Sequence, residues 1–330
     1  MKSVFLASTP LQVICCTEAR HHYPVSEKVT IYLVKPDNNQ TCEQMKFILE
    51  KMGWSKSEQV WLGKKSYYLR LLSHIRRLLR EKIDYLFVGN PGSAAQELFF
   101  NNICSEHTVF VDDGVATLKY AAYMDSNGLK SSLSPAKKSV FSFLGLKCPG
   151  IYAEKIEFFT VFDILPCSRF TVSRNTLDVF SDIFVSGNDS DWSGKYVGYI
   201  GHPGRKEADY IRMREHIDFI TKRHPGSVIH YFMHRKERFE KVAEVLSGIA
   251  VEIKTPGKPI EVEVAFSKDG YIAFYSFIST ALYTLKLVFP SVQVFRVSEP
   301  GNRPDYEHYD SIVEQMEKIG VGEVNAQNSE

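Results

Sequence analysis

Residues 195–233 have the sequence KYVGYIGHPGRKEADYIRMREHIDFITKRHPGSVIHYFM. The apolar run at residues 196–200 predicts a strand, which the breakers Gly201-His202-Pro203-Gly204 end. Residues 207–223 predict a helix that His224-Pro225-Gly226 closes, and residues 228–233 predict the next strand. A strand, a helix and a second strand in this order are typical of a βαβ unit with parallel strands, so the segment predicts an α/β domain.

The same alternation extends along the chain in both directions. Two α/β patterns in tandem predict two Rossmann-like domains that face a central cleft, the arrangement of many nucleotide-sugar enzymes. We expect an N-terminal domain at 1–165, a linker at 166–194, a C-terminal domain at 195–320 and a frayed tail at 321–330. The further predicted strands are 3–7, 29–34, 85–88 and 108–111 in the first half and 249–253, 270–275 and 292–296 in the second.

Length and composition agree with two folded domains. The chain has 330 residues, more than one hydrophobic core usually supports, and its 44% hydrophobic and 24% charged residues are typical of globular proteins. Its 40 Lys and Arg against 39 Asp and Glu give a net charge of +1, which excludes a general electrostatic attraction to nucleic acid. The six cysteines are scattered without metal-site spacing, so we expect reduced thiols in a cytoplasmic protein.

Three segments bear on membrane or acceptor contact. The weakly charged stretch 271–289 approaches the length of a membrane span, but its hydroxyl residues and Lys286 favour a strand, a loop and a helix. Residues 66–82 predict a basic amphipathic helix, which is either a surface helix packed on the sheet or a peripheral contact with the inner membrane. Its expected apolar face is Leu69, Leu72, Ile75 and Leu79. The polar segment 124–149 predicts an acceptor loop or a small helical insertion.

Polar residues follow several predicted strands, where an open α/β sheet places its ligand groups. In the first half, Asp112, Asp113 and Gly114 come at the end of the strand at 108–111. Gly114 frees the backbone to turn, so one carboxylate can act as a general base while the other has a structural role. A helix N-cap or a solvated turn is the alternative interpretation of this pair.

In the second half, His234 and Arg235 close a predicted strand, where a cationic imidazole and a guanidinium can contact a departing phosphate. Ser279 and Thr280 precede a helical segment, so their hydroxyls and the free amides of the helix N-terminus predict a phosphate site without a metal. Glu261 follows a turn rich in proline and glycine, where a carboxylate can accept both hydroxyls of a ribose. A structural histidine and ordinary N-capping are the alternatives for the first two.

In their order along the chain, these motifs resemble those of the bacterial sialyltransferases of glycosyltransferase family 52 and the related capsule polysialyltransferases of family 38. The resemblance rests on Asp112-Asp113-Gly114, on His234 and on Ser279-Thr280. It extends to Ser8-Thr9-Pro10-Leu11-Gln12 and to residues 274–282 and 289–292. The resemblance therefore spans most of the chain, in short separate segments that follow the family's order. Arg235 stands where the family motif has proline.

The resemblance implies an inverting, direct displacement on a CMP-activated sugar by an enzyme with a GT-B fold. Asp113, or Asp112 in its place, would take the proton of the acceptor hydroxyl. His234 would act as an acid toward the CMP phosphate. CMP carries one phosphate, so a histidine and hydroxyls can stabilise the leaving group that UDP enzymes often give to a divalent metal, and no metal or other cofactor is expected.

The resemblance also implies how the substrates are bound. Ser279 and Thr280 would hold the phosphate, Glu261 the cytidine ribose, and Gly201 would let the backbone approach the donor. Gly114 and Arg235 complete the expected binding residues. The donor would be the CMP ester of sialic, legionaminic or pseudaminic acid or of Kdo, and the acceptor a lipid-linked or other bacterial surface glycan of lipooligosaccharide or capsule. Related enzymes also form homodimers.

Two other functions fit the sequence. Asp189-Ser190-Asp191 has the spacing with which metal-dependent transferases bind a nucleotide-diphosphate sugar, although an ordinary linker has the same composition. The second is a non-catalytic protein of envelope assembly that binds a nucleotide or a lipid-linked glycan. Neither a G-x-S-x-G motif nor a P-loop motif occurs in the sequence.

Overall fold

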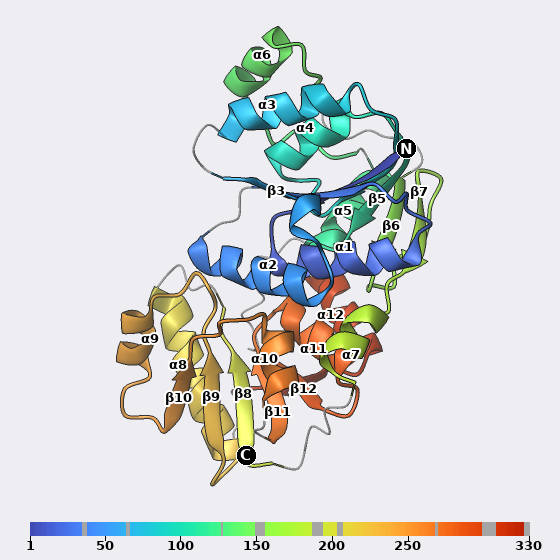
Figure 1. The fold of residues 1–330 in the computed structure, drawn as a ribbon. Helices are drawn as coiled ribbons and strands as arrows, with labels where there is room; N and C mark the ends of the chain where they lie inside the picture. The colour runs from blue at the N-terminus through green and yellow to red at the C-terminus, as the bar shows by residue number, and fades with distance from the viewer. Residues whose placement is uncertain are drawn as a thin grey trace. The chain divides into compact units, whose positions relative to one another are not determined.

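The computed structural model describes residues 1–34, 38–63, 67–126, 128–148, 156–186, 194–202, 207–267, 270–298 and 308–326. The chain divides into two compact units, Met1–Ile183 and Phe184–Glu330. Each unit is built on one parallel sheet with helices packed against it (Figure 1). The predicted class, two Rossmann-like α/β units in tandem, is therefore confirmed.

The first sheet has seven strands in the order β3-β2-β1-β4-β5-β6-β7. Its strands are β1 (Lys2–Ala7), β2 (Val29–Val34), β3 (Gln59–Leu62), β4 (Ile83–Val88), β5 (Ser105–Val111), β6 (Ile156–Thr160) and β7 (Phe170–Arg174). The helices are α1 (Pro10–His22), α2 (Asn39–Lys51), α3 (Tyr67–Leu78), α4 (Ala94–Asn102), α5 (Ala116–Ser126), α6 (Pro135–Phe143) and α7 (Asp178–Phe184), with a 3₁₀ turn η1 (Lys56–Glu58).

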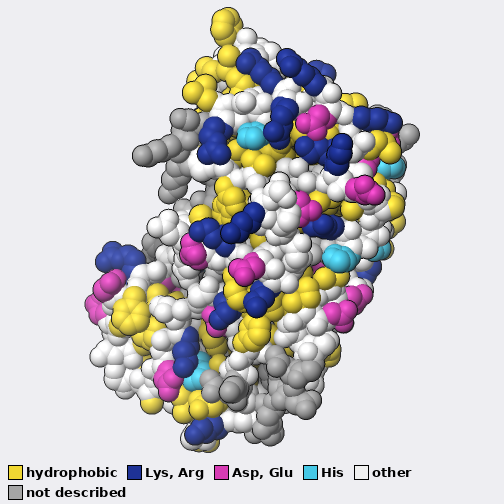
Figure 2. Space-filling model, viewed as in Figure 1, with side chains coloured by type: hydrophobic (Ala, Val, Ile, Leu, Met, Phe, Trp, Pro, Cys, Tyr) yellow, Lys and Arg dark blue, Asp and Glu magenta, His cyan; other side chains and the backbone are white. Residues whose placement is uncertain are grey.

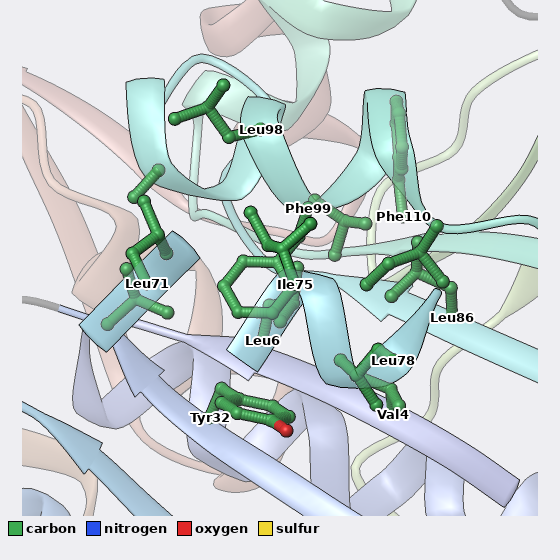
Figure 3. Close-up of a cluster of buried hydrophobic side chains, with 14 of the residues drawn as sticks. Val4, Leu6, Tyr32, Leu71, Ile75, Leu78, Leu86, Leu98, Phe99 and Phe110 are labelled. Atoms are coloured by element: carbon green, nitrogen blue, oxygen red, sulfur yellow. The ribbon is translucent and has the colours of Figure 1, made fainter. Parts of the chain in front are cut away.

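The core of the first unit lies on both faces of its sheet, because successive side chains of a strand point to opposite faces. Val4 and Leu6 of β1 pack against α3 and α4, and Figure 3 shows Leu6 near Ile75 and Val4 near Leu78. Phe5 points the other way and stacks on Phe87 with ring centroids 4.3 Å apart. Burial on both faces explains why these strands are continuously apolar in sequence.

The second sheet has six strands in the order β10-β9-β8-β11-β12-β13. Its strands are β8 (Tyr196–Ile200), β9 (Val228–Phe232), β10 (Val251–Lys254), β11 (Tyr271–Ser276), β12 (Gln293–Ser298) and β13 (Gly322–Asn325). The helices are α8 (Glu207–Arg223), α9 (Phe239–Val245), α10 (Ile260–Phe266), α11 (Thr280–Val288) and α12 (Tyr309–Lys318). Counted from the first strand of each sheet, both orders begin 3-2-1-4-5, as in Rossmann sheets that bind dinucleotides.

The domain boundaries differ from the expected ones at two places. The expected linker at 166–194 contains β7, which pairs with β6 at the edge of the first sheet, and α7. The expected frayed tail at 321–330 contains β13, which pairs with β12 and buries Val324. Both strands are short, partly polar edge strands, so they lack the apolar run by which a central strand is recognised in sequence.

The basic amphipathic helix is present as α3, and its buried face matches the expected one at Leu72 and Ile75 but not at Leu69 and Leu79. Leu71, Leu72, Ile75 and Leu78 are buried, whereas Leu69 is 71% and Leu79 is 53% exposed. The leucines of this segment allow two overlapping helical faces, and packing against β1, β2 and α4 selects one of them. The polar segment 124–149 holds the small helix α6.

The apolar stretch at 271–289 forms β11, a turn and α11, as the sequence predicts. No helix in the described parts of the chain is long and apolar enough to cross a membrane.

Candidate functional site

Each sheet has a switch point, where the strand order reverses and the connections that follow two neighbouring strands leave in opposite directions. In the first unit it lies between β1 and β4, and in the second between β8 and β11. Ligands of open α/β sheets bind beyond the carboxyl ends of the strands at such points. The residues that follow β1, β4 and β5 therefore form a candidate site in the first unit, and those that follow β8, β9 and β11 form a candidate site in the second.

In the first unit, the two predicted carboxylates have different environments. Asp112 is 1% exposed, and its carboxylate accepts hydrogen bonds from Thr160 Oγ1 at 2.5 Å and Val161 N at 2.8 Å. Burial raises the pKa of Asp112 to about 6, against the hydrogen bonds that lower it. Because these bonds hold the turn after β6 against the end of β5, Asp112 has a structural role.

Asp113 is half-buried and is held from two sides. Gln12 Nε2 donates to Asp113 Oδ1 at 2.5 Å, and the Tyr120 hydroxyl donates to Asp113 Oδ2 at 3.3 Å. The backbone turns sharply after Asp113, because Gly114 has a φ of 69°, in the region that favours glycine. The turn directs the chain into α5, whose Thr117 hydroxyl accepts the Asp113 N–H at 3.0 Å.

Gln12 is fixed by a wider polar network at the carboxyl ends of β1 and β4. Its Oε1 accepts the N–H of Ser8 at 2.7 Å, and Gln96 Nε2 donates to the Ser8 hydroxyl at 3.0 Å. The backbone at Gly89 leaves room for Gln12, since a Cβ there would lie 2.8 Å from Gln12 Oε1. Gln12 is not among the site residues predicted from sequence, although it lies in the stretch Ser8–Gln12 that carries part of the family resemblance.

In the second unit, His234 follows β9 and is held by backbone contacts. Its Nδ1 accepts the N–H of Lys236 at 3.1 Å, so the proton of the neutral ring lies on Nε2. Burial, then the charges of Arg235 and Lys236, lower the pKa of His234 to about 4. The expectation of a cationic imidazole is therefore wrong for the ligand-free protein: at neutral pH, His234 is a neutral hydrogen-bond donor.

Glu237 is a site residue that sequence reasoning missed. Its carboxylate accepts the N–H of His234 at 2.6 Å and the hydroxyl of Tyr231 at 2.7 Å, and burial raises its pKa to about 7. A Cβ on Gly201 would lie 2.4 Å from Glu237 Oε2 and 2.8 Å from the Tyr231 hydroxyl. Because Gly201 has no Cβ, the chain just after β8 can lie directly against the Glu237 carboxylate. This close packing explains the glycine at this position. The spacing His-x-x-Glu was the available sequence indication.

A crevice lined by aromatic and charged side chains opens beside Glu237 at the switch point of the second sheet. It is lined by Tyr199, His202, Asp209, Tyr210, Arg212, Met213, His216, Tyr231, Glu237 and Phe277. The Arg212 guanidinium lies 5.4 Å from the centroid of the Phe277 ring, and Tyr199 and His216 share a 2.9 Å hydrogen bond. His202, in a His-Pro pair that matches no expected motif position, lies at the same sheet edge as His234, and its charge also lowers the pKa of His234.

The hydroxyl pair and Glu261 belong to α11 and α10, and no residue of these two helices lines the crevice. Ser279 is the N-cap of α11 and accepts the N–H of Ala281 at 3.2 Å, while Thr280 is the first residue of the helix. Glu261 lies in α10 rather than in the turn before it, and its carboxylate accepts the hydroxyl of Thr284 on α11. Burial raises the pKa of Glu261. Ordinary capping accounts for the Ser279 contact, and Glu261 has a partner within the unit.

The predicted residues therefore form two groups. Asp112, Asp113 and Gly114 lie in the first unit, whereas Gly201, His234, Arg235, Glu261, Ser279 and Thr280 lie in the second. Asp189 and Asp191, the alternative metal ligands, lie outside the described residues. Within the described ranges, no three His, Cys, Asp or Glu side chains are grouped so that they could hold a metal ion.

Comparison with known proteins shows the fold. No protein-family model matches the sequence, and no curated protein matches it either. Similar solved structures include a protein assigned as a UDP-N-acetylglucosamine 2-epimerase from Listeria monocytogenes, with 14% identity over 90% of this chain and 78% of that one and a TM-score of 0.58. The UDP-GlcNAc 2-epimerase of Neisseria meningitidis bound to UDP-GlcNAc has 13% identity, coverage of 97% and 89%, and a TM-score of 0.55.

A complex of the Staphylococcus aureus protein MnaA with UDP has 12% identity, coverage of 90% and 79%, and a TM-score of 0.52. These identities are too low to carry an activity from one protein to another, so the likeness is one of fold. Together with the two Rossmann-like sheets, it places this chain in the GT-B fold class.

Proposed function

We propose that this protein is an inverting glycosyltransferase that moves sialic acid, or a related nonulosonic acid, from its CMP ester to the hydroxyl of a bacterial surface glycan. The proposal rests on the motif resemblance and on the fold class, whose solved members include proteins bound to nucleotides and nucleotide sugars. The observation that carries it is the state of His234. A neutral imidazole with its proton on Nε2, at the carboxyl edge of a Rossmann sheet, is a hydrogen-bond donor suited to a single phosphate.

In the proposed reaction, Asp113 takes the proton of the acceptor hydroxyl, and the acceptor oxygen attacks the anomeric carbon of the donor. The bond from that carbon to the CMP phosphate oxygen breaks, and CMP leaves with the electron pair. His234 donates a hydrogen bond through Nε2 to this oxygen, and the N-terminus of α11 stabilises the phosphate charge. Asp113 is the base in preference to Asp112, because both Asp112 oxygens are occupied inside the first unit.

The crevice beside Glu237 has an accessible volume of only about 20 Å³, so we propose that a nucleotide binds along its rim rather than in its interior. Phe277 and Tyr210 offer aromatic faces to a base, and Arg212 and His202 offer positive or hydrogen-bonding groups to a phosphate. Glu261 remains our candidate for the ribose, in which case its bond to Thr284 is exchanged for bonds to the ribose hydroxyls. The reaction requires no metal, and the acceptor is held by the first unit.

The test is a donor and acceptor screen with the purified protein. CMP-sialic acid, CMP-Kdo, UDP-GlcNAc and ADP-heptose are each supplied with a panel of lipooligosaccharide and capsule oligosaccharides, and the released nucleotide is measured. We expect acceptor-dependent CMP release from a CMP-nonulosonic acid, unchanged by EDTA. Release of UDP that EDTA abolishes and manganese restores would favour Asp189 and Asp191 instead. Nucleotide binding without any turnover would favour the non-catalytic alternative, and UDP-GlcNAc epimerisation would contradict the transferase proposal.

A further inference from the structure

Helices α3 and α6 of the first unit pack together and form one outer surface, which we call the α3–α6 surface. The rings of Tyr68 on α3 and Phe141 on α6 lie 5.4 Å apart, and Lys137 Nζ donates to the Tyr68 hydroxyl at 3.1 Å. Arg76 Nη2 donates to the carbonyl of Leu144 at 3.2 Å, just after α6. Figure 1 shows the two helices side by side. The α6 helix is therefore held on the body of the unit by aromatic and polar contacts.

Large apolar side chains project outward from this surface. Phe143 is 91%, Leu69 is 71% and Val140 is 56% exposed, whereas Phe141 is only 4% exposed and joins the core. Val140 and Phe143 are three residues apart and so share one face of α6, which differs from the face on which Phe141 is buried. Single exposed apolar residues are common, but an exposed face built from Leu, Val and Phe on two adjoining helices indicates a contact surface.

The charges on these two helices have one sign, and Arg77 pairs at 3.7 Å with Glu81, which follows α3. Residues 67–78 of α3 contain Arg70, Arg76 and Arg77, residues 135–143 of α6 contain Lys137 and Lys138, and neither segment contains an Asp or Glu. The whole chain has a net charge of only +1, so this is a local concentration of positive charge. Figure 2 shows Lys and Arg side chains gathered beside protruding hydrophobic side chains in the region where Figure 1 places α3 and α6.

We propose that the α3–α6 surface docks this protein on an anionic lipid bilayer. Phe143, Val140 and Leu69 enter the interface between headgroups and acyl chains, and the surrounding Lys and Arg side chains contact the negative headgroups. A second copy of this chain does not suit the same surface, because a two-fold contact between two α3–α6 surfaces would oppose like charges without any acidic partner on either helix. This inference is independent of the proposed donor and of the catalytic residues.

The first experiment is co-sedimentation of the full-length protein with sucrose-loaded vesicles. One set is pure phosphatidylcholine. The other contains roughly 30 mol% phosphatidylglycerol, which gives the vesicle surface a negative charge. We expect binding to the anionic vesicles that weakens steeply with salt, because exposed charges are screened within about 10 Å at 0.1 M salt. Equal binding to both vesicle types, or none to either, would overturn the proposal.

Matched variants assign the binding to this surface. Each cation near an anionic membrane strengthens binding by about fivefold, so R70Q together with K138Q should weaken it about 25-fold. The control K46Q with K51Q on α2 makes the same change in net charge, and we expect it to bind within about twofold of wild type, because these lysines lie outside the α3–α6 surface. Melting temperatures of all variants within about 2 °C of wild type confirm that they are folded.

A second pair of variants tests the contribution of the apolar side chains to vesicle binding. F143S should weaken binding about tenfold or more, because its ring contributes to insertion. L165S, at a residue that is 81% exposed in the same unit, should leave binding unchanged. If F143S binds as wild type does, or if light scattering shows a dimer that F143S dissociates in the absence of lipid, the bilayer is not the occupant of this surface. Acceptor-dependent activity on soluble oligosaccharides is measured separately, so a failed transferase proposal does not affect this result.

Discussion

Gln12 and Asp113, which are 101 residues apart in sequence, meet at the carboxyl edge of the first sheet, where Gln12 Nε2 donates to Asp113 Oδ1 at 2.5 Å. One residue comes from the first turn of α1 and the other from the end of β5. The contact fixes the orientation of a half-buried carboxylate on a rigid frame, which is what a general base needs. It also distinguishes Asp113 from Asp112, which faces the interior of the unit.

The two neighbouring aspartates should therefore respond differently to the same substitution. We expect Asp113→Ala to lower the transfer rate by about 10²- to 10⁴-fold with a smaller fall in melting temperature than Asp112→Ala, because the base is lost from a half-buried rather than a fully buried position. Asp112→Ala should instead destabilise the first unit by about 1–3 kcal/mol, because Val161 N and Thr160 Oγ1 lose their acceptor. Thermal unfolding and steady-state kinetics measure both. The opposite pattern would make Asp112 the base.

Removal of the Gln12 contact tests orientation alone. Gln12→Leu should lower kcat by about 10- to 100-fold and leave KM for the CMP donor unchanged, because the base is present but no longer held in position. Gln96→Leu is the comparison variant: Gln96 contacts Ser8, Asn90 and, at 3.5 Å, Gln12 Oε1, but it does not contact Asp113, so its effect on kcat should be smaller. A rise in KM without a change in kcat would show that Gln12 contributes to binding instead.

The pKa of His234 should rise when the donor phosphate binds. Its pKa is lowered to about 4 in the ligand-free protein by burial and by neighbouring positive charges. A phosphate near Nε2 favours the charged imidazole, so CMP should raise this pKa by about 1 to 3 pH units. Histidine NMR titration measures the change, with His234→Gln assigning the signal. Cytidine, which lacks the phosphate, should leave the titration unchanged, and an equal response to both ligands would contradict the proposed contact.

Glu237 should make the stability of the protein depend on pH. Burial raises the pKa of Glu237 from 4.5 to about 7, so between these values the folded chain holds a proton that the unfolded chain has released. The stability from this proton is full below about pH 4.5 and is lost as the pH rises to about 7. Glu237→Gln should therefore show a smaller fall in melting temperature than wild type between about pH 5 and pH 7.5. Identical pH profiles would show that Glu237 is charged in the folded protein.

Gly201 should tolerate no side chain. In Gly201→Ala the new Cβ would lie 2.8 Å from the Tyr231 hydroxyl and 3.0 Å from His234 N, as well as against Glu237. We expect a loss of about 1–3 kcal/mol in the free energy of unfolding and a loss of CMP binding, because the contacts that hold His234 must shift. Gly63→Ala is the control, since its Cβ would meet nothing within 4 Å. Denaturant unfolding and calorimetric CMP titration give the two readouts.

Much of the fold could be predicted from the sequence, because it depends on local patterns. The apolar runs at 29–34 and 196–200, bounded by breakers and followed by amphipathic segments, specify central strands and the helices between them. The strand-end positions of Asp113, His234 and Ser279 follow from the same patterns. The edge strands β7 and β13 were not predictable in this way, because their pairing with β6 and β12, rather than an apolar run of their own, makes them strands.

The sequence by itself determined the α/β class, the two units and the residues that end their strands, since hydrophobic periodicity and turn chemistry act over a few residues. Only the tertiary structure decided which side chains surround each candidate. It separated Asp112 from Asp113 by burial, gave His234 its neutral state through the Lys236 amide and a desolvated setting, and brought Glu237 against Gly201. It also left Leu69 and Phe143 exposed beside a basic face. Burial and long-range hydrogen bonds depend on how distant segments pack, and no local pattern records that.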